Sequence, residues 1–131
     1  LWSIPAERMK DGREHVLPLS PPAIALYKQA AVFREAGNPL VFPGQRRGKP
    51  LSDMTLTKIC RNANIDAVPH GFRSSFRDWV AEETTFDGEI AKMALAHAIS
   101  NKVEAAYRRG NLLEKRRVLM NVWANFCCSK N

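Results

Sequence analysis

Apolar residues at helical spacing, separated by turn-forming residues, most constrain the fold of this chain. In the clearest segment, over residues 71–83, Phe72, Phe76, Trp79 and Val80 fall at positions i, i+4, i+7 and i+8. Residues at this spacing lie on one side of an α-helix. The segment therefore predicts a helix with a buried apolar stripe, which needs other apolar elements to pack against.

Further helices are predicted where similar spacing follows a capping residue. Ser20, Ser52 and Asp87 each precede such a segment and suit a helix N-terminus. In the first helix, the apolar face and its flank hold Ile24, Leu26, Tyr27, Ala30, Ala31 and Phe33. The expected helices run from Pro21-Pro22 to a stop at Gly37-Asn38-Pro39, over 53–63, over 88–96, from Ser100 or Asn101 to Gly110, and over 112–127.

Two short strands are predicted near the beginning, at residues 2–5 and 14–19. The Asp11-Gly12 pair between them is a turn signal, so we expect an antiparallel hairpin whose tip carries Lys10 and Arg13. Leu40-Val41-Phe42 is a candidate for another short strand. The expected fold is one mainly α-helical domain over residues 1–131, with a small antiparallel β-hairpin.

The charge balance favours a polyanionic partner. The chain has 20 Lys and Arg against 13 Asp and Glu, which gives a formal net charge of +7. Such a balance suits nucleic acid, because neutralised phosphates release counterions. The turn-rich loop over residues 43–50 concentrates three of these positive charges.

The composition also excludes several classes of protein. The chain has three cysteines, Cys60, Cys127 and Cys128. An odd number of cysteines, two of them adjacent, argues against a disulfide framework and fits a reducing cytoplasm. Cys60 and Cys127 are expected to pack as small hydrophobic residues. No metal site is expected, because His15, His70 and His97 have no Cys-x-x-Cys near them. Neither a membrane-spanning run nor a signal peptide is predicted.

One ordered set of side chains suits chemistry on a phosphodiester. His70 and Arg73 lie one helical turn apart, and His97 and Tyr107 follow. Pro69 suggests that a helix begins here, with free amides that favour an anion. Positive groups can neutralise the charge that builds up when a tyrosine hydroxyl attacks phosphorus. Taken singly, each residue also has an ordinary explanation: a surface ion pair, a helix cap or a core aromatic.

The motifs that carry a family resemblance extend over essentially the whole chain. They are Met9-Lys10, the run from His15 to Ser20, Val41-Phe42-Pro43-Gly44, the run from Val68 to Arg73, Ala94-Leu95-Ala96-His97 and Ala106-Tyr107-Arg108-Arg109. Together they closely resemble the C-terminal catalytic domain of tyrosine recombinases, and are most similar to the integrases of prophages and genomic islands.

The resemblance implies a role for each residue of the set. Tyr107 would be the nucleophile that forms a 3′-phosphotyrosyl link, and Arg73 and His97 would hold the non-bridging oxygens. His70 would bind phosphate or assist proton transfer, and Lys10 would protonate the leaving 5′-oxygen. One phosphodiester replaces another, so neither ATP nor a metal cofactor is implied. The basic residues predicted to contact DNA are Arg13, Arg46, Arg47, Lys49, Arg77, Arg108 and Arg109.

The resemblance also implies partners and shows one departure. The partners would be double-stranded DNA attachment sites, further protomers in a tetramer on DNA, and accessory DNA-bending proteins, all in a bacterial cytoplasm. The family pattern has another arginine ahead of the hairpin, and no residue here matches it. Since such an arginine is worth about 10³–10⁵ in rate in other phosphoryl transfers, we expect a truncated and nearly inactive catalytic domain, without the N-terminal DNA-binding domains.

Two other functions remain open from the sequence. A non-catalytic module could use the same basic helices to bind the DNA backbone. A type IB topoisomerase would share the tyrosine chemistry, but would relax DNA without a defined site.

Overall fold

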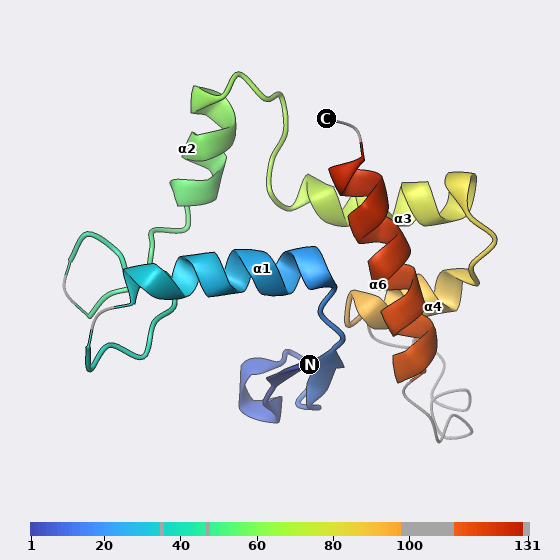
Figure 1. Cartoon of the computed structure of the whole chain (residues 1–131), viewed down its shortest axis with the longest axis horizontal. Coiled ribbons are helices and arrows are strands. Elements are labelled where there is room, and N and C mark those ends of the chain that lie inside the picture. Colours follow the sequence, from blue (N-terminus) through green and yellow to red (C-terminus); the bar gives the residue numbers. More distant parts are fainter. Residues whose placement is uncertain (35, 47, 98–111, 130–131) are drawn as a thin grey trace. The chain divides into compact units, whose positions relative to one another are not determined.

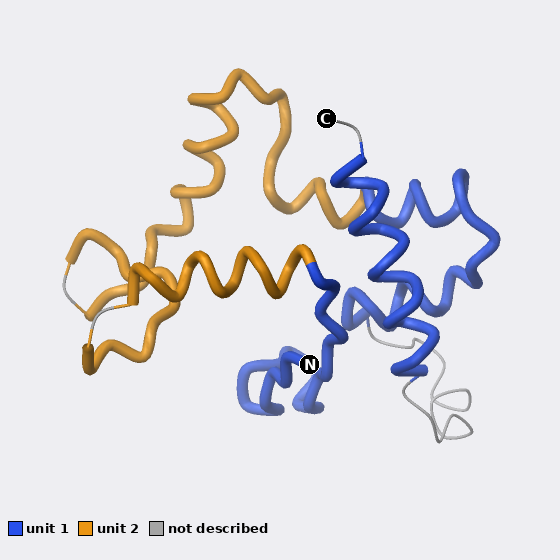
Figure 2. The backbone as a smooth tube through the Cα atoms, viewed as in Figure 1, with its two compact units in different colours: residues 1–21, 75–131 blue, residues 22–74 orange. Residues whose placement is uncertain are grey.

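The computed structural model describes residues 1–34, 36–46, 48–97 and 112–129. The chain divides into two compact units, shown in different colours in Figure 2. Unit 1 comprises Leu1–Pro21 and Ser75–Asn131, and unit 2 comprises Pro22–Ser74.

Unit 1 begins with the predicted hairpin. Strands β1 (Trp2–Ile4) and β2 (His15–Leu17) pair antiparallel, with Ser3 opposite Val16. The prediction of two antiparallel strands is confirmed. The connection is longer than an Asp-Gly turn alone, because the short 3₁₀-helix η1 (Ala6–Arg8) follows β1 before the chain turns back.

The helices of unit 1 follow much later in the sequence. They are the larger part of α3 (Gly71–Glu83), all of α4 (Gly88–Ala94) and all of α6 (Leu113–Cys128), labelled in Figure 1. The expected range of α3 is confirmed. Asp87 caps α4 as predicted, since its Oδ1 accepts a hydrogen bond of 2.9 Å from the backbone N–H of Glu89.

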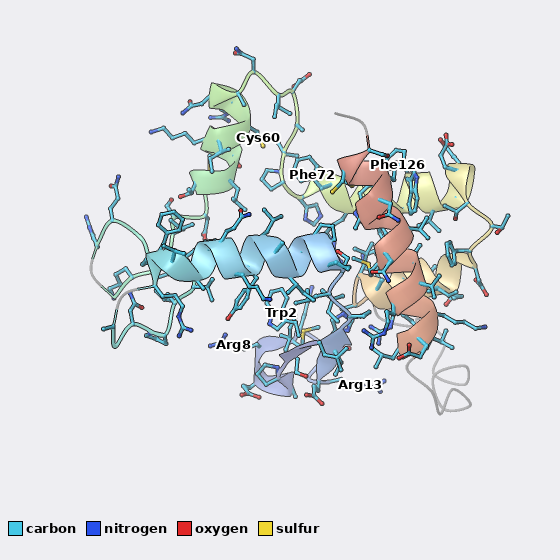
Figure 3. The ribbon with its side chains drawn as sticks, in the orientation of Figure 1. Trp2, Arg8, Arg13, Cys60, Phe72 and Phe126 are labelled. Carbon is cyan, nitrogen blue, oxygen red and sulfur yellow. The ribbon has the colours of Figure 1, made fainter. Side chains whose placement is uncertain are left out.

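Aromatic and aliphatic side chains from these three helices form the core of unit 1. Leu119 of α6 is fully buried, and Phe76, Trp79 and Val80 of α3 are almost so. The Trp79 and Trp123 rings lie 4.9 Å apart between centroids, and Trp79 and Phe126 lie 5.3 Å apart. Phe126 is labelled on α6 in Figure 3. Burial of large rings of this kind dominates the stability of a small core.

Three side chains on these helices are more exposed than the periodicity predicts. Phe72, at the start of α3, is 51% exposed, so the buried stripe begins one turn later at Phe76. Val122 falls at the spacing of the apolar side of α6, with Leu119 and Phe126, but is 39% exposed. Cys127 is exposed as well, because it lies in the last turn of α6 beyond the aromatic cluster.

Unit 2 contains α1 (Pro21–Ala30) from its second residue on, the 3₁₀-helix η2 (Ala31–Phe33), and α2 (Thr55–Asn62). The first helix ends well before the predicted stop at Gly37. The prediction that Ser52 caps α2 is wrong, because the N-cap residue is Met54 and no side chain caps it. Ser52 Oγ instead accepts a hydrogen bond of 3.3 Å from Met54 N–H, ahead of the helix. Cys60 is buried, as predicted.

Most of the apolar face predicted for α1 is exposed. Ala30 is buried, but Ile24, Leu26, Tyr27 and Phe33 are between 38% and 72% exposed. Leu40-Val41-Phe42 is not a strand; instead, an isolated β-bridge joins Pro43 to Pro50. Hydrophobic spacing identified these segments but not what covers them.

The described residues confirm the predicted fold class, which is mainly α-helical with a small antiparallel sheet. The helix expected over 100–110 lies outside the described residues. A helix long and hydrophobic enough to cross a membrane does not occur in the ranges that the structure describes. The assignment of all 131 residues to a single domain stays a prediction.

Candidate active site

A pocket in unit 1 brings together the β1–β2 connection, the end of α4 and the first turn of α6. Its volume is about 280 Å³. The lining residues are Met9, Asp11, Arg13, Glu14, His15, Val16, Met93, Ala96, His97 and Arg116. Segments far apart in the sequence therefore meet around one space, which is large enough for a phosphate group.

The β1–β2 connection presents one of its two predicted basic residues, Arg13, at this pocket. Gly12 adopts a left-handed φ of 67°, and its N–H donates to the Met9 carbonyl oxygen at 3.1 Å. Lys10 is exposed and lies between the lining residues Met9 and Asp11. Arg13, which lines the pocket, is labelled in Figure 3. The turn thus places the Arg13 guanidinium at the pocket, whereas Lys10 itself does not line it.

His97 reaches the same pocket from the end of α4. Ala96 has a left-handed φ of 53°, which ends the helix, and the His97 N–H then donates to the Lys92 carbonyl oxygen at 2.9 Å. His97 is half-buried and lines the pocket. The structure therefore brings His97 together with the segment that carries Lys10 and Arg13.

Two further basic residues line this pocket that sequence reasoning did not single out. Arg116 of α6 is 2% exposed, and its Nη1 donates to the Val16 carbonyl oxygen at 2.8 Å. Burial lowers the pKa of Arg116, although a guanidinium stays charged near neutral pH. Burial lowers the pKa of His15, and the nearby Arg116 charge lowers it further. No local pattern distinguishes Arg116 from its cationic neighbours Lys115 and Arg117.

His70 and Arg73 lie in unit 2, where α3 begins. His70 is exposed directly before the helix, and Arg73 is half-buried in its first turn. The expectation of free amides at this N-terminus is wrong. The N–H groups of Gly71, Phe72 and Arg73 donate to the carbonyl oxygens three residues earlier, at 2.8, 3.3 and 3.2 Å. An anion here would depend on side chains rather than on these amides.

A second, strongly basic pocket of about 580 Å³ lies in unit 2, between the loop at 44–51 and α2. Arg46 and Lys49, predicted from the sequence, line it together with Lys58 of α2, which the sequence did not indicate. Gly44 permits the loop to close, because a Cβ there would lie 2.3 Å from the Pro50 carbonyl oxygen. Its N–H donates to the Lys49 carbonyl oxygen at 2.7 Å.

Of the remaining predicted site residues, only Arg77 lies among the residues that the structure describes. Arg77 is exposed on α3, in unit 1. Tyr107, Arg108, Arg109 and Arg47 lie outside the described residues. Within the described ranges, His, Cys, Asp and Glu side chains form no group of three that could hold a metal ion.

Comparison with known proteins assigns this architecture to a family. The sequence model of the phage integrase family matches residues 1–112. Prophage integrase IntA of Escherichia coli K12 is 35% identical over 127 residues, which cover 95% of this chain and 30% of IntA. The integrase of Enterobacteria phage P4 is 31% identical over 144 residues, which cover 96% of this chain and 33% of that protein. No solved structure matches significantly.

The chain thus spans about a third of the length of these relatives. The family match covers both the β1–β2 connection and the His97 segment, which meet at the unit 1 pocket. The residues predicted from the resemblance lie within the same matched range. From these findings, the chain belongs to the phage integrase family.

Proposed function

We propose that this chain takes part in site-specific DNA recombination through a covalent 3′-phosphotyrosyl intermediate. The observation that carries the proposal is the unit 1 pocket, where His97 meets the segment bearing Lys10 and Arg13. A half-buried imidazole beside basic side chains suits the non-bridging oxygens of a phosphodiester. The membership of the phage integrase family supports DNA attachment sites as the substrate.

In the proposed reaction, the phenolic oxygen of Tyr107 attacks phosphorus and a Tyr–O–P bond forms, while the phenol proton passes to a base, for which His70 is the candidate. The bond between phosphorus and the 5′-oxygen breaks, and its electron pair goes to that oxygen, which takes a proton from the Lys10 ammonium. Arg73 and His97 hold the non-bridging oxygens, and His70 binds phosphate or assists proton transfer. A 5′-hydroxyl from another strand then attacks the phosphotyrosine and releases Tyr107.

The test uses the two tyrosines of the chain, Tyr27 and Tyr107. Because the chain spans 30% of IntA, we would replace the matched region of IntA with this chain. The chimera is incubated with a suicide substrate that carries the IntA attachment site. Tyr107→Phe should reduce the covalent adduct by about 10³-fold or more, with DNA binding nearly intact.

Tyr27→Phe is the matched control, since Tyr27 is a half-exposed tyrosine of α1. It should leave the adduct yield within about twofold. An undiminished adduct in the Tyr107→Phe chimera would remove Tyr107 from the mechanism. Binding with no adduct in the unaltered chimera would favour a non-catalytic DNA-binding module, and relaxation of supercoiled DNA without an attachment site would favour a topoisomerase.

A further inference from the structure

Arg116 differs from the cations beside it on α6. Lys115 is exposed, and Arg117 forms a surface ion pair with Glu114, with Nε and Oε2 3.1 Å apart. Arg116 is only 2% exposed. A buried guanidinium has lost most of its hydration, which is strongly unfavourable unless hydrogen bonds replace the water. Its retention in the interior therefore indicates a specific partner.

That partner lies on the hairpin. Arg116 Nη1 donates to the Val16 carbonyl oxygen at 2.8 Å, across 100 residues of sequence. A hydrogen bond from a charged donor is about twice as strong as a neutral one. Val16 is the central residue of β2, and β2 follows directly on the connection that carries Lys10 and Arg13. The bond thus joins the hairpin to α6.

Arg116 also lines the pocket that His97 and the hairpin share. The helix α6 packs against α4, whose end carries His97. One side chain therefore contacts the hairpin from a helix that is packed on the His97-bearing element. Asp11 and Glu14 line the same space and offset part of its positive charge.

We propose that Arg116 is a positioning residue, which holds the hairpin so that Lys10 and His97 act on the same phosphodiester. This inference rests on the proposed function. Arg116 itself takes no part in bond making or breaking. Without it, the Val16 carbonyl loses its charged donor, the connection moves relative to α4, and proton transfer to the 5′-oxygen slows.

The first readout needs no catalysis and uses the 131-residue chain. Amide hydrogen exchange is measured for residues 9–17 and for the aromatic core around Trp79 and Trp123. Arg116→Met should speed exchange in residues 9–17 by about tenfold or more, while the core changes by less than about twofold. Arg117→Met, which removes an adjacent exposed guanidinium, is the matched control and should leave both regions unchanged.

The second readout separates positioning of the acid from general loss of structure. The IntA chimera is given substrates whose leaving group is either the normal 5′-oxygen or a 5′-sulfur. A thiolate is stable near neutral pH and leaves without a proton. Arg116→Met should slow cleavage of the oxygen substrate by about 10–100-fold but that of the sulfur substrate by less than about threefold.

Arg116→Lys retains the charge and a hydrogen-bond donor. Its ratio of cleavage rates for the oxygen and sulfur substrates should therefore lie between the ratios of the wild type and of Arg116→Met. If Arg116→Met does not fold, the lysine variant decides by the same ratio. Equal losses with both leaving groups, or no loss with either, would overturn the proposal. If the unaltered chimera cleaves neither substrate, the proposed function fails, and unchanged exchange in residues 9–17 would then separately refute the anchoring role.

Discussion

Leu119 of unit 1 and Leu26 of unit 2 are both leucines on α-helices, but their surroundings differ completely. Leu119 is fully buried, whereas Leu26 is 66% exposed. Around Leu119, α3 and α6 contribute interlocking aromatic rings, and α4 contributes aliphatic side chains. Along α1 and α2, Ala30 and Cys60 are buried while larger apolar side chains stay exposed. Stability is therefore concentrated in unit 1, and unit 2 offers an open basic loop and pocket.

The same contrast distinguishes the two basic pockets. Unit 1 holds the hairpin, His97 and the buried Arg116 around one pocket, where fixed geometry matters most. Unit 2 holds Arg46, Lys49 and Lys58, whose long side chains suit looser contact with a phosphate backbone. We therefore expect substitutions in unit 1 to change rates and stability, and those in the unit 2 pocket to change binding.

Among the substitutions that test this comparison, the largest expected effect is at Lys10. Lys10→Ala in the IntA chimera should slow cleavage of the oxygen substrate by about 10²–10⁴-fold, the usual contribution of a general acid. Arg13→Ala, on the same connection, is the control and should cost far less. Single-turnover rates with saturating enzyme make the comparison. Equal losses for the two variants would contradict a specific role for Lys10.

A second test compares the two leucines directly in the 131-residue chain. Leu119→Ala leaves a cavity in the core and should lower the free energy of unfolding by about 2–5 kcal/mol. Leu26→Ala keeps a good helix former at an exposed site and should change it by less than about 0.5 kcal/mol. Urea titrations followed by Trp fluorescence measure both. Similar losses of unfolding free energy for the two variants would show that Leu26 is buried in the folded protein, and would contradict the difference between the units.

A third test addresses the basic pocket of unit 2. Replacing Arg46, Lys49 and Lys58 with Ala should weaken binding to a short duplex without an attachment site. The slope of log K against log salt concentration should become shallower by up to about 3, if each residue contacts one phosphate. The matched control replaces three other exposed cations of unit 2, namely Lys28, Arg34 and Arg61. An equal change in slope for the control would show diffuse attraction instead of a site.

The smallest expected effect is a pH dependence from His15. Burial, and then Arg116, lower its pKa below the ordinary value of 6.5. As the pH falls below 6.5, the unfolded chain takes up the proton before the folded chain does, so stability decreases. When the pH is lowered from about 7.5 to 5.5, the Tm of His15→Gln should therefore fall by less than the Tm of the wild type. An equal fall in Tm for the variant and the wild type would show that His15 does not contribute to the pH dependence of stability.

The parts of the fold that follow from local pattern could be predicted. The stripe of Phe76, Trp79 and Val80 and the Asp87 cap depend on neighbours within a few residues, so their spacing alone identified them. The end of α1 at Ala30 could not be predicted, because the apolar spacing continues to Phe33 after the α-helix has given way to η2.

In the candidate site, too, features set by local sequence could be predicted and those set by tertiary contacts could not. The positions of Lys10 and Arg13 on the hairpin connection follow from a turn signal, and that of His97 follows from a helix end. Arg116 and Lys58 were missed, because only tertiary contacts distinguish them from neighbouring cations. The occupied amides at the start of α3 were also missed, since the turn over Val68–His70 takes up their hydrogen bonds.

The most direct measurement is to locate the covalent link between protein and DNA. The IntA chimera is trapped on its suicide substrate, digested with protease and nuclease, and analysed by tandem mass spectrometry. We expect a nucleotide bound to the phenolic oxygen of Tyr107. A nucleotide on Tyr27, on another side chain of the chain or on the IntA portion would contradict it.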